Sequence, residues 1–182
     1  TTGLHNYKEC WDIIVNERLL NALRNLLGQD ILYLYNSHIE ELNNTDNEYG
    51  WHRDNPCRIF GKGPDWDSKE NYNVIRVGFF FSSFGIGKSG VNVIPGSHKK
   101  KYTFSQLLRL FFYKTKNIKI SFIKSIRKKI EKHIGVDIKT EEGDCVMFLA
   151  NAHHTPIPQS GGARKSLYLS YGTNNKHARN YN

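Results

Sequence analysis

Residues 51–54, Trp51-His52-Arg53-Asp54, and residues 151–154, Asn151-Ala152-His153-His154, decide how the rest of the chain is interpreted. Side chains alternate along an extended segment, so His52 and Asp54 are expected on one face of a short strand. An imidazole and a carboxylate side by side can hold one face of a divalent ion. A histidine from a remote strand would complete the 2-His-1-carboxylate triad of non-haem Fe(II) sites. The two stretches together predict a metal site.

A lone His-x-Asp pair is weak evidence for a metal site. The sequence around the second stretch strengthens the prediction. Gly143-Asp144 is typical of a turn, residues 145–149 follow as an apolar strand, and the histidine doublet closes it. A loop rich in Pro, Gly and Ser comes next, and Arg164 begins the last strand. A guanidinium beside a metal is a bidentate receptor for a planar carboxylate.

The rest of the pattern predicts a mainly β protein with few helices. Apolar residues recur at three- and four-residue intervals over residues 8–27, and Gly28 follows, which predicts a helix. Strands are expected where β-branched and aromatic residues gather, over residues 31–39, 52–54, 74–84, 91–94, 136–138, 144–150 and 166–171. Many short strands, with helices confined to one end and one insertion, favour a β sandwich or jelly roll.

Length and composition fit one globular domain over residues 1–182, with a loose polar tail from residue 174. No apolar run approaches the roughly 20 residues that span a bilayer. The start at Thr1 shows no signal peptide, so nothing suggests export. It has no initiator Met either, which leaves open whether a segment precedes it. Three scattered cysteines, Cys10, Cys57 and Cys145, indicate reduced thiols in a cytoplasmic protein.

The formal net charge is +9, and the excess is concentrated between residues 99 and 133. This stretch contains twelve Lys and Arg residues and one acidic residue, Glu131. We expect an inserted basic segment over about 99–134, with helical pieces near 104–113 and 121–134. One interpretation is a solvated pair of amphipathic helices. The other is a cap that recruits an anionic partner, such as a nucleotide-, CoA- or carrier-linked molecule.

The order of the motifs is specific as a set, although no single piece is. His52 and Asp54 are followed by Ile94-Pro95-Gly96-Ser97-His98, then by Asp144 with a histidine ten residues on, and then by Arg164. This order resembles the phytanoyl-CoA dioxygenase family from about residue 31 to residue 172. The resemblance implies a double-stranded β-helix, a cupin-like jelly roll, and an oxygenase that depends on Fe(II) and on 2-oxoglutarate as co-substrate.

The resemblance also implies roles for individual residues. His52, Asp54 and His154 match the family's iron ligands. Arg164 matches the residue that pairs with the distal carboxylate of 2-oxoglutarate. Asn36 falls where ectoine hydroxylase-like members place a Gln that touches the co-substrate.

The doublet His153-His154 makes the third ligand ambiguous. The interval back to Asp144 favours His154, because a strand does not easily absorb an insertion. The interval forward to Arg164 favours His153, which would restore the family's commoner spacing of eleven. Loops change length more freely than strands, so we predict His154 and keep His153 as the alternative.

Arg76 and the remaining histidines have separate interpretations. Arg76 lies in the apolar strand 74–84, and a buried charge needs a partner. An inward Arg76 is a candidate receptor for an anionic substrate group, whereas an outward one would lie on a solvated face, and the sequence leaves both open. His98 follows a Pro-Gly turn signal and is interpreted as a turn residue. Surface positions are expected for His5, His38, His133 and His177.

The function implied by the resemblance is oxidative decarboxylation of 2-oxoglutarate coupled to hydroxylation of an unidentified small organic substrate, with an anionic or carrier-linked one as a candidate. Molecular oxygen would be consumed. The carboxylate of Asp54 argues against a halogenase, in which chloride needs that coordination position. Two alternatives stay open: a cupin-like metal enzyme without 2-oxoglutarate, and a basic polyanion-binding module on a degenerate oxygenase scaffold. Nucleic acid ranks low, since no second arginine closely follows Arg164.

Overall fold

The fold was analysed in a computed structural model that describes residues 3–42, 51–54, 73–81, 89–99, 107, 135–157 and 164–179. The helical elements within these residues are the 3-10 turns η1 (Leu4–Asn6), η2 (Lys8–Cys10) and η3 (Ser97–Lys99) and the helices α1 (Trp11–Ile14), α2 (Glu17–Leu27) and α6 (Lys176–Arg179). The strands are β1 (Ile31–Leu42), β2 (Val74–Phe80), β3 (Ser89–Val93), β4 (Val136–Thr140), β5 (Cys145–Leu149), β6 (His154–Pro156) and β7 (Arg164–Thr173).

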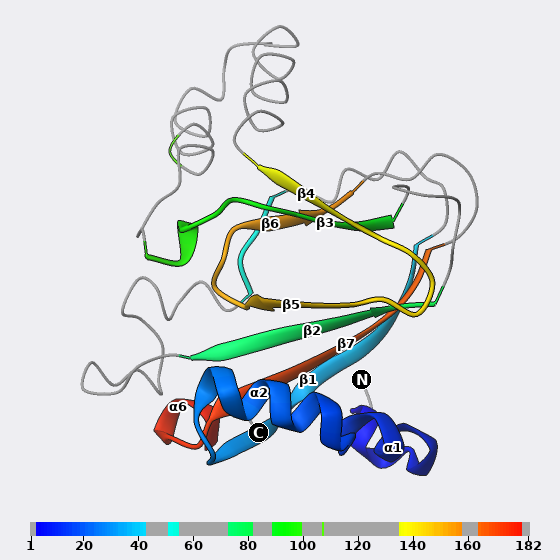
Figure 1. The fold of residues 1–182 in the computed structure, drawn as a ribbon, viewed down its shortest axis with the longest axis vertical. Coiled ribbons are helices and arrows are strands. Elements are labelled where there is room, and N and C mark those ends of the chain that lie inside the picture. Colours follow the sequence, from blue (N-terminus) through cyan, green and yellow to red (C-terminus); the bar gives the residue numbers. More distant parts are fainter. Residues whose placement is uncertain are drawn as a thin grey trace, which may run out of the picture.

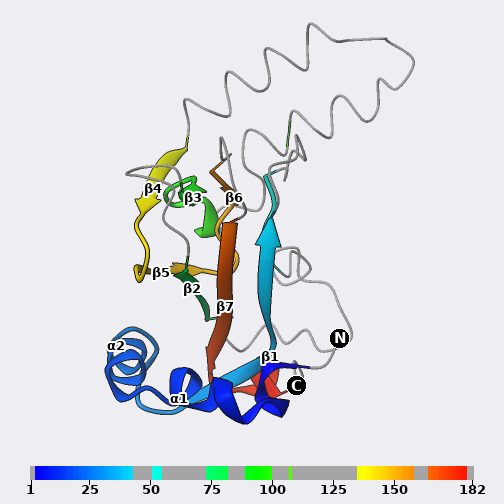
Figure 2. The same cartoon turned by 90° about the vertical axis from the view of Figure 1, so that its right-hand side faces the viewer.

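The strands form two antiparallel sheets that face each other (Figure 1). The larger sheet has the order β1-β7-β2-β5, and the smaller has the order β4-β3-β6. Strands distant in sequence are neighbours in both sheets, and β1 and β7 lie side by side along most of their length (Figure 2). This arrangement is the jelly roll, or double-stranded β-helix, that the sequence predicted.

The larger sheet is covered on both faces. Its outer face packs against the N-terminal helices, where Ile14 of α1 and Leu19 and Leu23 of α2 join the core formed by Ile75, Val77, Leu167, Leu169 and Tyr171 (Figure 1). Its inner face meets the smaller sheet, where Phe80 and Phe148 pack with Val91 of β3. Burial on both faces explains why β2 is an almost continuous apolar run.

The predicted helix over residues 8–27 is interrupted, so that prediction is wrong in its middle. α1 ends at Ile14, and Asn16 has an extended backbone with φ −61° and ψ 119°. The Asn16 side chain accepts a hydrogen bond from the amide of Leu19 at 3.2 Å and caps α2. Asn competes well for backbone hydrogen bonds, which makes a new helix start more favourable here than a continuous helix.

The loose tail predicted from residue 174 is also wrong for residues 174–179. The Asn174 amide nitrogen donates to both carboxylate oxygens of Asp30, at 3.0 and 3.1 Å, and α6 follows. Ala178 packs with Leu34 and Val74, and His177 is buried instead of lying at the surface. Polar composition predicts exposure only on average, and here tertiary contacts decide the conformation.

Two predicted segments fall almost wholly outside the described residues. The loop over residues 55–73 contributes only residue 73, and the basic insertion over 99–134 contributes only Lys99 and Leu107. The helical pieces expected at 104–113 and 121–134 therefore stay predictions. Within the described part of the chain, none of the helices is both long enough and apolar enough to cross a membrane.

Candidate metal centre

Backbone pairing brings the two motif-bearing stretches together. The amide of His52 donates to the carbonyl of His154 at 2.9 Å, and the amide of His154 donates back to His52 at the same distance. The amide of Asp54 donates to the carbonyl of Ala150 at 2.9 Å. The segment 51–54 therefore runs alongside the connection from β5 to β6 as an isolated antiparallel bridge, which is shorter than the strand predicted for it.

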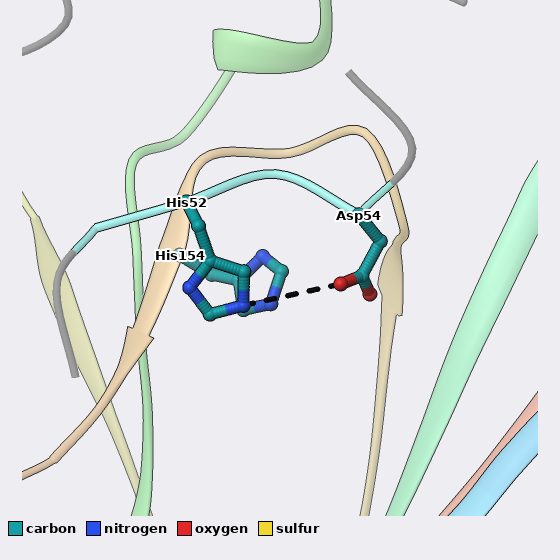
Figure 3. A group of neighbouring side chains, drawn as sticks. All are labelled: His52, Asp54 and His154. Atoms are coloured by element: carbon teal, nitrogen blue, oxygen red, sulfur yellow. Dashed lines mark ion pairs between the residues drawn. The ribbon is translucent and has the colours of Figure 1, made fainter. Parts of the chain in front are cut away.

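Three side chains converge at this bridge (Figure 3). Nε2 of His52 lies 3.9 Å from Oδ1 of Asp54, and the imidazole rings of His52 and His154 lie 4.4 Å apart at their centroids. One ligand atom from each of the three residues falls within 4.8 Å of the others. Two imidazole nitrogens and one carboxylate oxygen are the donor set of the non-haem Fe(II) facial triad, so the residues present fit that ion.

His154 is held in a form suited to metal binding. Its Nδ1 lies 2.8 Å from the carbonyl oxygen of Ala152, which can only accept, so Nδ1 carries the proton and Nε2 has a free lone pair. Burial lowers the pKa of His154 to about 4, although the nearby carboxylate of Asp54 opposes this shift. The neutral imidazole is therefore the form present at neutral pH, and it is the form that binds metals.

The cluster of His52, Asp54 and His154 is open to solvent on one side. The side chain of His52 is 45% exposed, while that of Asp54 is 16% exposed and His154 is buried. Phe148 of β5 packs against the His154 ring with 4.7 Å between centroids. The centre therefore has an apolar wall on the His154 side and an approach on the His52 side.

His153 does not belong to this group. Its ring is completely buried and lies 5.5 Å from the ring of Trp51, and its amide donates to the hydroxyl of Ser97 at 2.8 Å. His98, in η3, also lies outside the group, as its turn position predicted. The structure therefore places His154, and not His153, with His52 and Asp54.

Arg76 points inward, which the sequence had left open. Its Nε lies 3.2 Å from Oδ2 of Asp54, and its Nη1 donates to Oγ of Ser170 at 2.6 Å. The sequence reasoning missed Asp54 as the partner of this guanidinium. The sequence did contain a signal for a buried partner, because Arg76 is the single charged residue in a strand that is apolar on both faces.

Two residues, Asn36 and Arg164, are predicted to contact the co-substrate. The structure describes Asn36 but only the backbone of Arg164. Asn36 lies on β1 where the register with β7 shifts, and its carbonyl accepts a hydrogen bond from Arg76 at 3.2 Å. Arg164 begins β7, and its Cα is paired with that of Leu42. The Arg164 side chain lies outside what the structure describes, so its contact with a carboxylate stays a prediction.

Comparison with protein-family models gives one match that covers most of the chain. The model described as phytanoyl-CoA dioxygenase (PhyH) matches residues 1–166. The chain belongs to this family. This match confirms the resemblance that the sequence motifs of this PhyH-family chain predicted. A comparison with curated proteins gave no significant match.

Solved structures share the fold of this PhyH-family chain at low sequence identity. HygX from Streptomyces hygroscopicus with nickel and 2-oxoglutarate bound is 16% identical, with a TM-score of 0.59, 87% of this chain covered and 62% of that chain. SnoN, a non-heme alpha ketoglutarate dependent epimerase from nogalamycin biosynthesis, is 13% identical, with a TM-score of 0.60 and coverages of 94% and 59%. EvdMO1 is 13% identical, with a TM-score of 0.56 and coverages of 90% and 32%. The chain thus spans about one third to two thirds of the length of these proteins.

Proposed function

We propose that this PhyH-family chain is an Fe(II)- and 2-oxoglutarate-dependent oxygenase that hydroxylates a small organic substrate. The observation that carries the proposal is the convergence of His52, Asp54 and His154 within 4.8 Å. Family membership supports it, and so does the fold shared with HygX, which was solved with nickel and 2-oxoglutarate bound.

The residues of the chain have separate tasks in this proposal. His52, Asp54 and His154 hold the iron, and the bound iron with 2-oxoglutarate supplies the oxidising chemistry. Burial keeps His154 neutral and its Ala152 hydrogen bond fixes the orientation of its ring. Phe148 excludes water from one side of the centre.

We assign the distal carboxylate of 2-oxoglutarate to Arg164. Its support is the family motif and its position on β7, two and six residues before Ser166 and Ser170, which are both buried. Asn36 is the second proposed contact with the co-substrate, and the hydrogen bond from Arg76 to its carbonyl supports this assignment.

Hydroxylation is proposed more narrowly than oxygenase chemistry in general. The solved structures that share the fold include the epimerase SnoN and the non-heme monooxygenase ThoJ. A small molecule and molecular oxygen are the proposed partners, with an anionic or carrier-linked substrate favoured by the basic residues between 99 and 133. Cys10 and Cys145 are free thiols, which agrees with the proposed cytoplasmic location.

The deciding experiment is an anaerobic titration of the protein with Fe(II) and then 2-oxoglutarate, followed by visible absorption. We expect the weak charge-transfer band of the chelated co-substrate in the wild type and in the control His98→Ala, and its loss in His52→Ala. A band that is absent in the wild type, or that persists in His52→Ala, would contradict the proposal.

The same titration separates the two alternatives. Metal uptake without a response to 2-oxoglutarate favours the cupin-like enzyme. Binding to heparin that weakens steeply with salt, together with no metal uptake, favours the polyanion-binding module.

A further inference from the structure

We propose that Arg76 is a positioning residue that fixes how Asp54 presents its carboxylate to the metal, an inference that rests on the function proposed above. Arg76 holds one oxygen of Asp54, so that only the other oxygen faces the two histidines. The ligand would then occupy a single coordination position and leave the neighbouring positions open.

The two oxygens of the Asp54 carboxylate have different surroundings. Oδ2 lies 3.2 Å from Nε of Arg76. Oδ1 lies 3.9 Å from Nε2 of His52, and Figure 3 shows this second contact. Oδ2 is buried and accepts no hydrogen bond from the described residues, so its contact with Arg76 is one of charge. The positive charge beside Oδ2 makes it a poorer ligand for a metal cation than Oδ1. The geometry therefore favours coordination through Oδ1 alone.

The guanidinium is itself fixed by two other strands. Nη1 donates to Oγ of Ser170 on β7 at 2.6 Å and to the carbonyl of Asn36 on β1 at 3.2 Å. That carbonyl lies at the register shift between Leu34 and His38, where β1 has no regular partner on β7. The ring of Tyr168 lies 5.8 Å from the guanidinium carbon and adds a cation–π contact. Arg76 thus has little freedom to move, and neither has the oxygen that it holds.

A purely structural role explains this arrangement less well. Arg76 is buried on β2, and its two sequence neighbours, Ile75 and Val77, pack in the core on the helix side of the sheet. A buried ion pair is often no more stabilising than a well-packed apolar substitute, because both charges lose their hydration. Placing the guanidinium against one oxygen of a metal-ligand carboxylate has a specific use, since contacts that orient metal ligands change metal affinity by roughly 10- to 100-fold.

The test is Co(II) binding by the metal-free protein, without 2-oxoglutarate or turnover. We expect Arg76→Gln to weaken Co(II) binding roughly 10- to 100-fold, because Asp54 loses the contact that orients it. The visible d–d spectrum should also change, because both oxygens of Asp54 can then reach the metal. Arg76→Lys, which keeps the cation, should recover part of the affinity. Ser170→Ala removes one of the hydrogen bonds that fix Arg76 and should cause a smaller change of the same kind. Arg24→Gln, which breaks an ion pair with Glu17 far from the centre, is the control and should match the wild type.

Thermal unfolding of each metal-free variant distinguishes an effect on the position of Asp54 from an effect on the stability of the fold. If Arg76→Gln does not fold, the uncharged Arg76→Met takes its place, and an altered Co(II) spectrum in a folded Arg76→Met supports the inference. Wild-type affinity and spectrum in the folded variant would overturn it, with the proposed function untouched. Failure of the wild type to bind Co(II) would instead overturn the proposed function and this inference with it.

Discussion

His153 and His154 are adjacent in the chain, yet the ring of His154 lies 4.4 Å from that of His52 while the ring of His153 lies 5.5 Å from that of Trp51. The extended backbone of this segment sends successive side chains to opposite faces. One histidine therefore faces the candidate metal centre, and the other fills the core behind it.

Exchanging each histidine for alanine should separate these two tasks. We expect His154→Ala to lose Co(II) binding by at least about 100-fold, because one of three ligands is removed. His153→Ala should keep metal binding but lower the free energy of unfolding by about 2 kcal/mol, because a fully buried ring leaves a cavity. Isothermal titration with Co(II) and urea denaturation measure the two effects. The opposite pattern in folded variants would make His153 the ligand.

Tyr171 connects β7 to the N-terminal helices. Its hydroxyl donates to the carbonyl of Ile14 at 2.7 Å, and burial raises its pKa. We expect Tyr171→Phe to lower the free energy of unfolding by about 1–2 kcal/mol, because the buried carbonyl loses its donor. Urea denaturation measures the change, with Tyr35→Phe on the exposed part of β1 as the comparison. Equal stability of Tyr171→Phe and the wild type would show that this hydrogen bond contributes nothing.

The Asn16 side chain starts α2 by capping the amide of Leu19. We expect Asn16→Ala to destabilise the protein by about 1 kcal/mol, since the first turn of the helix loses an acceptor. Asn16→Ser retains a capping oxygen and should lie within a few tenths of a kcal/mol of the wild type. Thermal and urea unfolding test both variants, and an equal loss in the two would assign the effect to something other than the cap.

The thiol of Cys145 should react slowly with alkylating agents. Although Cys145 is exposed, partial desolvation by the surrounding protein, followed by the negative charge of Asp144, raises the pKa of its thiol to about 11, so less thiolate is present at any pH below that value. We expect the alkylation rate, measured by mass spectrometry of the labelled peptide, to be still rising at pH 9.5. Asp144→Asn keeps the acceptor for the Glu141 amide and should increase the rate. A rate that levels off near pH 8.5 would contradict the raised pKa.

Local pattern was sufficient for much of the fold. Strands β1, β2 and β7 occur where β-branched and aromatic residues cluster, with ends that differ from the predicted ones by a few residues. The pairing of His52 with Asp54 on one face follows from the period of two along an extended chain. The preference for His154 followed from the fixed length of a strand, and the structure places His154 with the other two residues.

Other features depend on contacts between residues far apart in sequence. Whether Arg76 faces inward was undecidable locally, because both faces of β2 are apolar, and only the positions of Asp54 and Ser170 settle it. The docking of α6 requires Leu34 and Val74 to meet Ala178. The sequence by itself determined the strands and the kinds of ligand, since those follow from periodicity and side-chain chemistry. Only the tertiary structure decided which charges meet, because partners such as Arg76 and Asp54 lie far apart in sequence and only the fold brings them within contact distance.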